Sequence, residues 1–431
     1  MKARLISIIA VIAAGVLVLL LTISNRNAVE REYNTNLALA RTNAEKLIPY
    51  NSYNYYLKAF AISCEDEAIY REFLEQAEIL GDKFRRTAVE DYVVKFPESP
   101  AAYEELCKMH YDAGSYSQVL ETALKARELG LATEQVKNWY NECAFMLKNI
   151  KANVAEPHPF LGGYALVKVN DGYGFIQRNG SFVLAPMYTD ASAMMGSSAA
   201  VNDGEEWHIV NSAGYKVART SEPVDYMGIL VGGKIPVAQN GKYAYVTSSL
   251  VIPDDLPYDY ASNFKNGVAA VKKGDKWALI NTNEELIQDY IFEDVVLDEF
   301  DTCCNNGVIF AKKDGMYYMV NPQGGKISAQ AFDDARPFAG NGPAAVCIDG
   351  KWGFVDTAGN IVIEPQFEGA RSFNIGLGAV CMDGLWGYIN TSGTFRIECQ
   401  CEDCQSFATN GIAAVKENDI WKYVCLLSYY Y

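Results

Sequence analysis

The chain has 431 residues, of which 50% are hydrophobic and 21% are charged. This composition is that of a globular protein and excludes a wholly disordered or collagen-like chain. The formal net charge of -16 argues against a nucleic-acid-binding protein, because a phosphate backbone is held mainly by clustered Lys and Arg. At roughly 150 residues per domain, the length predicts two or three domains.

A hydrophobic run near the N-terminus predicts a membrane segment. Leu5 to Ile23 is interrupted only by one Ser, one Gly and one Thr, and as a helix it would span about 28 Å, close to the hydrocarbon thickness of a bilayer. We interpret residues 1–25 as a transmembrane anchor, with a cleaved signal peptide as the alternative. The short N-terminal tail favours an extracytoplasmic position for the rest, whereas a secreted or a cytoplasm-facing chain remain alternatives.

Residues 28–150 have the composition of a helical segment, rich in Ala, Leu, Glu, Lys and Tyr. After Pro100, large and small residues alternate at positions where two antiparallel helices would interlock. These positions are Leu106, Tyr111, Ala113, Gly114, Tyr116, Val119 and Ala126. The spacing resembles one tetratricopeptide repeat, with Glu65 to Val94 as a second helical pair, although Cys107 stands where that family prefers Gly. An unrelated helical hairpin or stalk is the alternative.

The rest of the chain repeats one pattern eight times. One aromatic residue, which we call the anchor, recurs at intervals of 34, 36, 34, 40, 35, 34 and 35 residues. The eight anchors are Tyr173, Trp207, Tyr243, Trp277, Tyr317, Trp352, Trp386 and Trp421. A period of this length predicts an array of equivalent supersecondary units.

Each unit has the pattern of a β-hairpin followed by a third strand. A small apolar residue stands six positions before the anchor, and an Asp-Gly or Asn-Gly pair separates the two in most units. These pairs suit a tight hairpin, because both residues tolerate positive φ. The second and third residues after the anchor are both apolar, which predicts a strand covered on both faces, as stacked units would provide.

One stretch carries a resemblance to a known family. Gly350-Lys351-Trp352-Gly353-Phe354-Val355, continuing through Gly359 to Pro365-Gln366-Phe367, resembles the WG, or KWG, repeat family of bacteria. The likeness covers residues 160–431, although His208 and Tyr318 replace the small residue that should follow the anchor in the second and fifth units. The resemblance implies a repeat array near the cell envelope, and it implies no catalytic mechanism and no site residues.

The predicted fold is therefore α+β multidomain: a transmembrane helix, a helical segment, and eight all-β units over residues 151–431. We expect a propeller, with an open β-solenoid as the alternative. The last unit ends at Tyr431 without a third strand, and Asn153 to Pro157 resembles Ile361 to Pro365. This resemblance predicts that the segment before the first unit completes the last one and closes a ring, so that deleting residues 151–159 should lower the melting temperature.

Most catalytic motifs are missing from the sequence. The three histidines have no motif around them, and no G-x-S-x-G is present. The repeated Asp residues are explained by hairpin turns. Cys399, Cys401 and Cys404 form C-x-C-x-x-C, a weak zinc or disulfide candidate that lacks a second ligand pair, and a degenerate repeat explains them better. We therefore predict no catalytic residue, cofactor or metal.

The many aromatic residues suggest recognition. Tyr260, Tyr290 and Tyr429–Tyr431 lie outside the repeat pattern, and exposed aromatics suit binding to proteins or glycans. The leading hypothesis is a membrane-tethered, non-catalytic binding or scaffold protein whose partner is a protein or a glycan, not a nucleic acid. The alternatives are an envelope hydrolase that cleaves glycans with paired carboxylates, and a structural envelope component.

Overall fold

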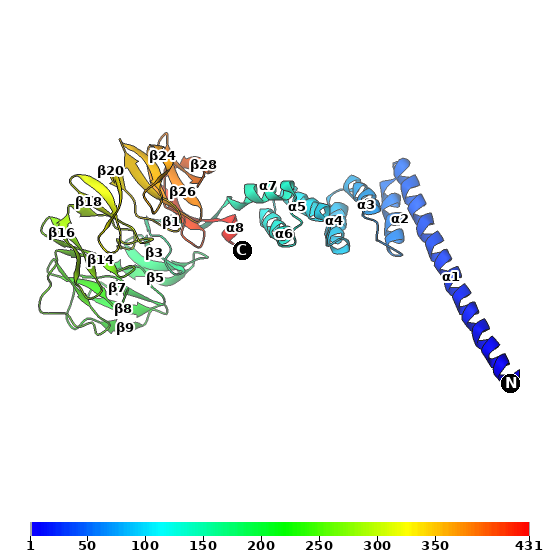
Figure 1. Ribbon diagram of the computed structural model, residues 1–431, viewed down its shortest axis with the longest axis horizontal. Helices are drawn as coiled ribbons and strands as arrows, with labels where there is room; N and C mark the ends of the chain where they lie inside the picture. Colours follow the sequence, from blue (N-terminus) through cyan, green and yellow to red (C-terminus); the bar gives the residue numbers. More distant parts are fainter. Residues whose placement is uncertain (1, 431) are drawn as a thin grey trace. The chain divides into compact units, whose positions relative to one another are not determined.

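The computed structural model describes residues 2–430, without the side chains of residues 2–14 and Leu20. The chain divides into two compact units, Met1–Ala144 and Phe145–Tyr431. The first is helical and the second consists almost entirely of β-strands (Figure 1). The strands begin at Leu147, a few residues before the predicted start of the β array at residue 151.

The helical unit contains seven helices within residues 2–144. They are α1 (Lys2–Glu45), α2 (Pro49–Phe60), α3 (Glu67–Leu80), α4 (Asp82–Lys95), α5 (Pro100–Asp112), α6 (Tyr116–Glu128) and α7 (Glu134–Ala144). Its core is aromatic: Tyr56, Tyr70, Phe73 and Tyr92 are almost fully buried. The rings of Tyr70 and Tyr92 stack at 5.1 Å and join α3 to α4. Burying large aromatic side chains is what stabilises short helices of this kind.

The two predicted helical pairs are confirmed as α3 with α4 and α5 with α6. Gly114 takes φ +67° in the turn between α5 and α6, and Val119 and Ala126 are fully buried between the helices. The likeness to a tetratricopeptide repeat goes beyond this helical arrangement and stays a prediction.

The predicted membrane anchor is only partly covered by the structure. Among the residues whose side chains are described, no helix is long and apolar enough to cross a bilayer. Residues 5–14 and Leu20, which make up more than half of the hydrophobic run from Leu5 to Ile23, lie outside that set.

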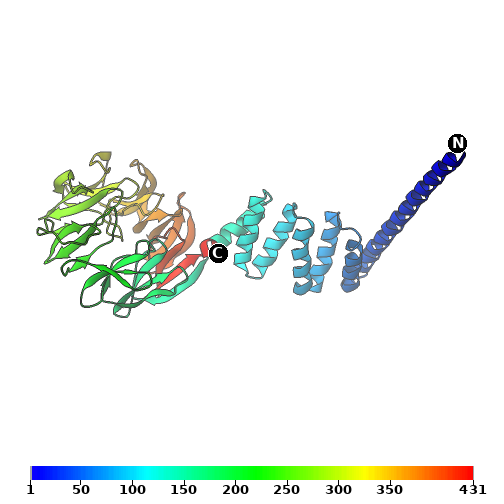
Figure 2. The ribbon, with the colours of Figure 1, turned by 90° about the horizontal axis from the view of Figure 1, so that it is seen from below.

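The strands of residues 145–430 form eight antiparallel sheets. Blade 1 is β2 (Glu156–Pro157), β3 (Tyr164–Val169), β4 (Gly172–Gln177) and β5 (Phe182–Tyr188); blade 2 is β6 (Asp190–Ala191), β7 (Ser198–Asn202), β8 (Trp207–Asn211) and β9 (Lys216–Arg219); blade 3 is β10 (Tyr226–Met227), β11 (Ile235–Gln239) and β12 (Lys242–Val246); blade 4 is β13 (Tyr260–Ala261), β14 (Val268–Lys273), β15 (Lys276–Asn281) and β16 (Leu286–Phe292). Blade 5 is β17 (Asp294–Val295), β18 (Ile309–Lys313), β19 (Met316–Val320) and β20 (Lys326–Phe332); blade 6 is β21 (Asp334–Ala335), β22 (Ala344–Ile348), β23 (Lys351–Val355) and β24 (Ile361–Phe367); blade 7 is β25 (Gly369–Asn374), β26 (Leu377–Met382), β27 (Leu385–Asn390) and β28 (Phe395–Cys401); blade 8 is β29 (Asp403–Cys404), β30 (Ile412–Glu417), β31 (Ile420–Leu426) and β1 (Leu147–Val154), after which α8 (Leu427–Tyr430) follows β31. The blades follow one another round a ring, so the unit is an eight-bladed β-propeller (Figures 1 and 2).

The ring is closed by β1, which pairs antiparallel with β31 and places Val154 opposite the last anchor, Trp421. The hydroxyl of Tyr423 donates to the carbonyl oxygen of His158 in blade 1 at 2.6 Å. Tyr423 stands two residues after its anchor, and the equivalent Tyr makes the same bond at two internal contacts. Tyr245 of blade 3 donates to the carbonyl oxygen of Ser262 in blade 4 at 2.7 Å. Tyr388 of blade 7 donates to the carbonyl oxygen of Gln405 in blade 8 at 2.8 Å. The contact between blades 8 and 1 is therefore built like an internal one, and the open solenoid is excluded.

Closure is confirmed, but the predicted alignment of the closing segment is wrong. The strand that completes blade 8 is Leu147–Val154, whereas Glu156–Pro157 forms the first strand of blade 1. Pro157 lies opposite Val167, just as Ala191 lies opposite Val201 in blade 2. The Glu-Pro pair suggested this assignment because Glu364-Pro365 lies in β24, the fourth strand of blade 6 and the third strand of the predicted unit. One dipeptide does not fix the register.

Blade 3 has three strands because proline interrupts its fourth. The turn after β12 still forms, with Leu250 at φ +54° in the place that Gly takes in most units. Pro253 and Pro257 follow, and a proline has no N–H to donate to a ladder. Only the bridge between Tyr243 and Tyr258 marks where the fourth strand would run.

Candidate functional site

One row of side chains crosses every blade on the face of the sheet that carries the anchor. In each blade, the first residue of the first strand pairs with a residue of the second strand, and that residue in turn pairs with the anchor on the third strand. In blade 5, Asp294 pairs with Lys312, and Lys312 pairs with Tyr317. Residues opposite each other in neighbouring strands point to the same face of a sheet. From blade 1 to blade 8 the rows are Glu156-Lys168-Tyr173, Asp190-Asn202-Trp207, Tyr226-Ala238-Tyr243, Tyr260-Lys272-Trp277, Asp294-Lys312-Tyr317, Asp334-Cys347-Trp352, Gly369-Cys381-Trp386 and Asp403-Lys416-Trp421.

The first strands lie at the centre of the ring. Two cavities are each lined by several blades at once, and the residues that line them come largely from first strands and from the loops that follow these strands. Five of the eight rows begin with a carboxylate. The sequence repeats this acid, but only the register shows that it shares a face of the sheet with the anchor.

In most rows a cation covers the anchor ring. The Lys168, Lys272 and Lys312 ammonium groups lie 5.0, 5.8 and 5.2 Å from the ring centroids of Tyr173, Trp277 and Tyr317. In blades 6 and 7 the second residue of the row is Cys instead of Lys. The cation over the anchor ring is then an Arg that stands two residues after the first residue of the row. Arg336 lies over Trp352, and Arg371 lies over Trp386. Such cation–π contacts favour a positive charge at each ring face.

The carboxylates of these rows are held by their neighbours. Glu156 accepts hydrogen bonds from Lys168 and from the Tyr173 hydroxyl, both at 2.9 Å. Tyr317 donates to Asp294 at 2.6 Å, and Arg371 reaches Asp403 in the next blade at 3.0 Å. Acid, cation and aromatic ring thus form one repeated polar unit.

A second set of repeated carboxylates is structural. The residue before each row is acidic in six blades, and its side chain accepts a backbone N–H from the hairpin between the second and third strands. These residues are Asp225, Asp259, Glu293, Asp333, Glu368 and Glu402. Sequence reasoning missed them, although the acid directly before each row was a visible signal.

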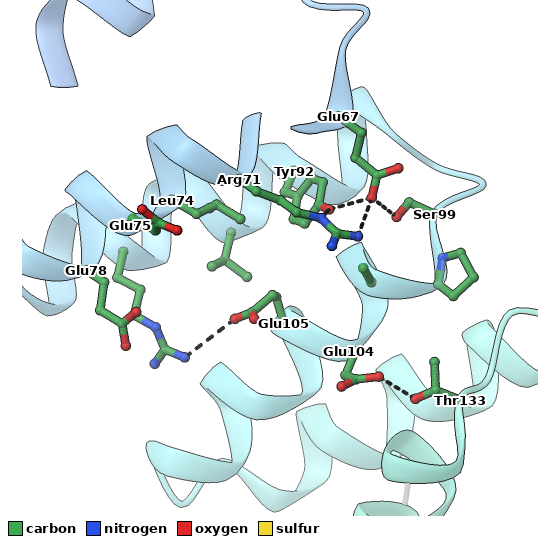
Figure 3. Close-up of a pocket in the computed structure, with 14 residues that line it drawn as sticks. Glu67, Arg71, Leu74, Glu75, Glu78, Tyr92, Ser99, Glu104, Glu105 and Thr133 are labelled. Atoms are coloured by element: carbon green, nitrogen blue, oxygen red, sulfur yellow. Dashed lines mark hydrogen bonds and ion pairs between the residues drawn. The ribbon is translucent and has the colours of Figure 1, made fainter. Parts of the chain in front are cut away.

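A cavity of about 590 Å³ opens in the helical unit (Figure 3). It is lined by one face of α3 and by parts of α4 and α5. The charged residues of this lining are five glutamates and two arginines. Glu67 accepts hydrogen bonds from Ser99 and Tyr92, both at 2.6 Å, and from Arg71 at 3.1 Å. These bonds, led by that from Ser99, lower the pKa of Glu67. Glu104 accepts from Thr133 at 2.6 Å.

The larger of the two central cavities of the propeller is the mouth cavity, a hollow of about 580 Å³ over blades 4 to 6. Val296 and Leu297 contribute apolar surface to it. Its aromatic and charged lining residues are Tyr260, Trp277, Tyr317, Asp259, Asp294, Asp334, Lys272 and Arg336. A concave site with apolar surface, aromatic rings and a few charged groups is the usual form of a ligand pocket.

The loop of blade 5 reaches towards the same rings. Residues 296–308 connect β17 and β18, and this longer loop explains the 40-residue interval between Trp277 and Tyr317. Asp298 holds the loop by accepting from Thr302 and Asn305. Asp301 accepts from the Tyr260 hydroxyl at 2.5 Å. Burial raises the pKa of Asp301 to about 7.

The predicted cysteine site is dispersed among repeat positions. Cys401 lies opposite the anchor Trp386, Cys404 occupies the small-residue position of a first strand, and both are buried. Burial raises the pKa of Cys404 to about 12, which keeps it a thiol. Cys399 is half-buried, and all eleven cysteines are free. Across the described residues, no group of His, Cys, Asp or Glu is arranged to hold a metal.

Of the aromatics predicted to lie outside the repeat, Tyr260 is in fact a row residue and lines the mouth cavity. Tyr290 is half-buried on the fourth strand of blade 4, with Lys273 over its ring. Tyr429 and Tyr430 pack against the core of blade 8, and Tyr431 lies outside the described residues. Only Tyr260 therefore joins the candidate site.

Comparison with known families supports the repeat. The family described as WG containing repeat matches residues 173–207, 258–277, 319–352, 352–386 and 386–421. The C-terminal unit carries WG repeats. Most matches run from one anchor to the next, so a WG repeat in sequence spans parts of two neighbouring blades. Residues 208–257, which include the three-stranded blade 3, are unmatched.

Other comparisons are more distant. No curated protein matches this chain. Among solved structures, one titled "Crystal structure of the eukaryotic initiation factor" is 10% identical, with a TM-score of 0.41 over 63% of this chain and 85% of the other. The Pan2 WD40 domain of Neurospora crassa is 10% identical, with a TM-score of 0.31 over 64% and 89%. Similarity at this level does not extend to ligands or partners.

Proposed function

We propose that the protein is a non-catalytic binding or scaffold protein whose WG-repeat propeller holds a partner at its mouth cavity. The observation that carries this proposal is the mouth cavity itself, where three blades supply aromatic rings, carboxylates and cations around an apolar patch. Tyr and Arg in a concave, partly buried setting are the residues that contribute most to recognition. The half-buried Tyr260 and Tyr317 beside Arg336 provide this combination.

The remaining parts of the proposal concern position. The hydrophobic run from Leu5 to Ile23 would tether the protein to a membrane. The glutamate-lined cavity of the helical unit offers a second binding surface. With one partner there and another at the mouth cavity, the protein would bring two partners together. A protein partner is the first choice, and a glycan the second, because both are recognised through aromatic rings flanked by charged groups.

A glycan hydrolase is the second candidate function, because Asp294 and Asp334 line the same cavity and paired carboxylates cleave glycosides. We place it second for a structural reason. Asp334 lies 3.5 Å from Arg336, and Asp259 accepts the N–H of Gly274 and pairs with Lys242. The hydrogen bonds from Lys242 and from Gly274 lower the pKa of Asp259, which makes this carboxyl a poor proton donor.

Site-specific crosslinking in intact cells tests the proposed function. A photo-reactive amino acid is placed at Leu297, which lines the mouth cavity, and in a separate chain at Val362, an exposed apolar residue on the fourth strand of blade 6. We expect a defined partner to be captured from position 297 and not from 362. Adding Asp294→Ala and Arg336→Ala to the 297 chain should reduce the yield at least several-fold. Equal capture at both positions, or no capture at 297, would contradict the proposal.

A further inference from the structure

Two neighbouring blades have no Lys or Arg at the positions that supply the cation over the anchor ring in five other blades. In other blades the cation comes from the second residue of the row or from the residue two positions after the first. These positions are Asn202 and Ser192 in blade 2, and Ala238 and Gly228 in blade 3. Blades 1, 4, 5, 6 and 7 all have Lys or Arg at one of these positions, over the ring. Trp207 and Tyr243 are therefore anchors without a cation of their own.

The rings of these blades form one continuous arc. Tyr226 begins the row of blade 3, and its ring lies 5.9 Å from Trp207 and 5.9 Å from Tyr243. Tyr243 continues to Tyr260 at 5.1 Å, and Tyr260 to Trp277 at 5.4 Å. Tyr226, Tyr243 and Tyr260 are half-buried, so this part of the arc is open to solvent, whereas Trp207 is buried. It adjoins the mouth cavity through Tyr260.

Two carboxylates face this arc without a cation. Asp190 begins the row of blade 2, is exposed, and forms no ion pair within the described part of the chain. Asp301 comes from the loop of blade 5; one of its oxygens accepts from Tyr260, and the other, Oδ2, is buried without a hydrogen-bond partner. The charges of both act on the Tyr226 hydroxyl. In other blades, Glu156 and Asp334 have a basic partner within 4 Å.

We propose that the arc of Trp207, Tyr226, Tyr243 and Tyr260, with Asp190 and Asp301, binds an organic cation, an ammonium or guanidinium group, in place of the missing Lys or Arg. Aromatic rings attract such groups, and a buried carboxylate without a counter-ion strengthens the attraction. This inference rests on the proposed function and adds a recognition site beside the mouth cavity, which it adjoins at Tyr260. The cation is either a free amine or the side chain of a partner polypeptide.

The site should respond to pH through Asp301. The groups that face this carboxyl are Tyr226, Tyr243 and Tyr245 of blade 3, Tyr260 of blade 4, and Asp298 and Cys303 of its own loop. Its pKa of about 7 leaves it mostly protonated at pH 6 and mostly ionised at pH 8. A cation binds the ionised form better, so affinity should rise by up to about tenfold between these pH values.

Calorimetric titration of the intact protein tests the inference with two sets of probes. Free probes are butylammonium and butylguanidinium, with butanol as the neutral control; peptide probes are acetyl-Gly-Lys-Gly-amide and acetyl-Gly-Arg-Gly-amide, with norleucine as the neutral control. We expect charged probes to bind and neutral ones not to bind. Tighter binding of the peptides would identify a polypeptide as the source of the cation, and equal or weaker binding would identify a free amine.

Variants locate the site. Tyr226→Leu and Asp301→Asn should each weaken binding about tenfold, Tyr226→Phe should retain most of it, and Asp301→Asn should also remove the pH dependence. The control is Asp383→Asn, which makes the same charge change at an exposed hairpin tip where φ is +51°, a conformation that Asn adopts readily. Equal binding of butanol and butylammonium, or unchanged affinity in Tyr226→Leu and Asp301→Asn, would overturn the inference. In that case, capture of a partner from position 297 would still support the proposed function, because that experiment does not depend on a cation.

Discussion

Replacing Leu147–Val154 with eight Gly and Ser residues is expected to destroy the cooperative unfolding of the propeller. The replacement keeps the chain length but removes the fourth strand of blade 8 and with it the closure of the ring. It also removes Leu147, Ile150 and Val154, which pack against blade 8 and blade 1. Val154 is buried, whereas Leu147 and Ile150 are half-buried. Full burial of an aliphatic side chain contributes about 1.5–3 kcal/mol, and the lost strand pairing adds to this. We expect a loss of at least about 5 kcal/mol in the free energy of unfolding, measured by urea titration with Trp fluorescence.

The control is the same type of replacement at Lys216–Arg219, the fourth strand of blade 2. That strand lies at the outer edge of an internal blade and is mostly exposed, so its loss leaves the ring closed. We expect a loss of roughly 1–2 kcal/mol and a single transition. Comparable destabilisation by both replacements would contradict a special role for β1.

The second large effect is expected for Gly353→Ala. A Cβ on Gly353 would lie 2.5 Å from the carbonyl oxygen of Ile363 and 2.7 Å from the nitrogen of Pro365. Both are backbone atoms of the fourth strand, which bulges here: Trp352 pairs with Phe367 and Phe354 with Ile363. Gly174 and Gly387 meet their fourth strands in the same way. This contact explains why Gly follows Trp in the WG motif.

Because the fourth strand of blade 6 is spaced for Gly353 and would have to shift to admit a Cβ, Gly353→Ala should cost about 2–4 kcal/mol of unfolding free energy. Blade 4 supplies the matched control, since it has the same bulge but carries Ala278 at this position. The reverse change, Ala278→Gly, should cost only about 1 kcal/mol, the ordinary price of a flexible residue in a strand. A neutral Gly353→Ala would show that the fourth strand adjusts freely.

Much of the fold follows from local signals that the sequence repeats. The anchors and the Asp-Gly turns predict hairpins because turn chemistry depends on only a few neighbouring residues. The strand missing after Trp421 predicts closure, because most other units have a strand pattern at that place, which is the fourth strand of a blade in the structure. Helical composition and the pattern around Tyr111 and Val119 similarly predicted α5 and α6.

Other features depend on contacts between distant segments. The closing strand, Leu147–Val154, carries none of the repeat's signature residues, so its register is set by pairing with β31 at the other end of the unit. Tyr260 looked like an exception to the repeat because its position is usually Asp, and only the strand register makes the two equivalent. The 40-residue interval marked an unusual unit, but the position of Asp301 beside Tyr260 depends on packing between blades.

Native-state hydrogen exchange of the intact chain tests ring closure most directly. The hydrogen-bonded amides of β1 should be protected to the same degree as those of β24, the fourth strand of blade 6, because both complete a four-stranded blade. The exposed residues Val251, Asp254 and Asp255 of blade 3, which lie outside any ladder, give the unprotected reference within the same molecule. Exchange of the β1 amides as fast as that reference, while β24 stays protected, would contradict the closed propeller on which the proposed binding site depends.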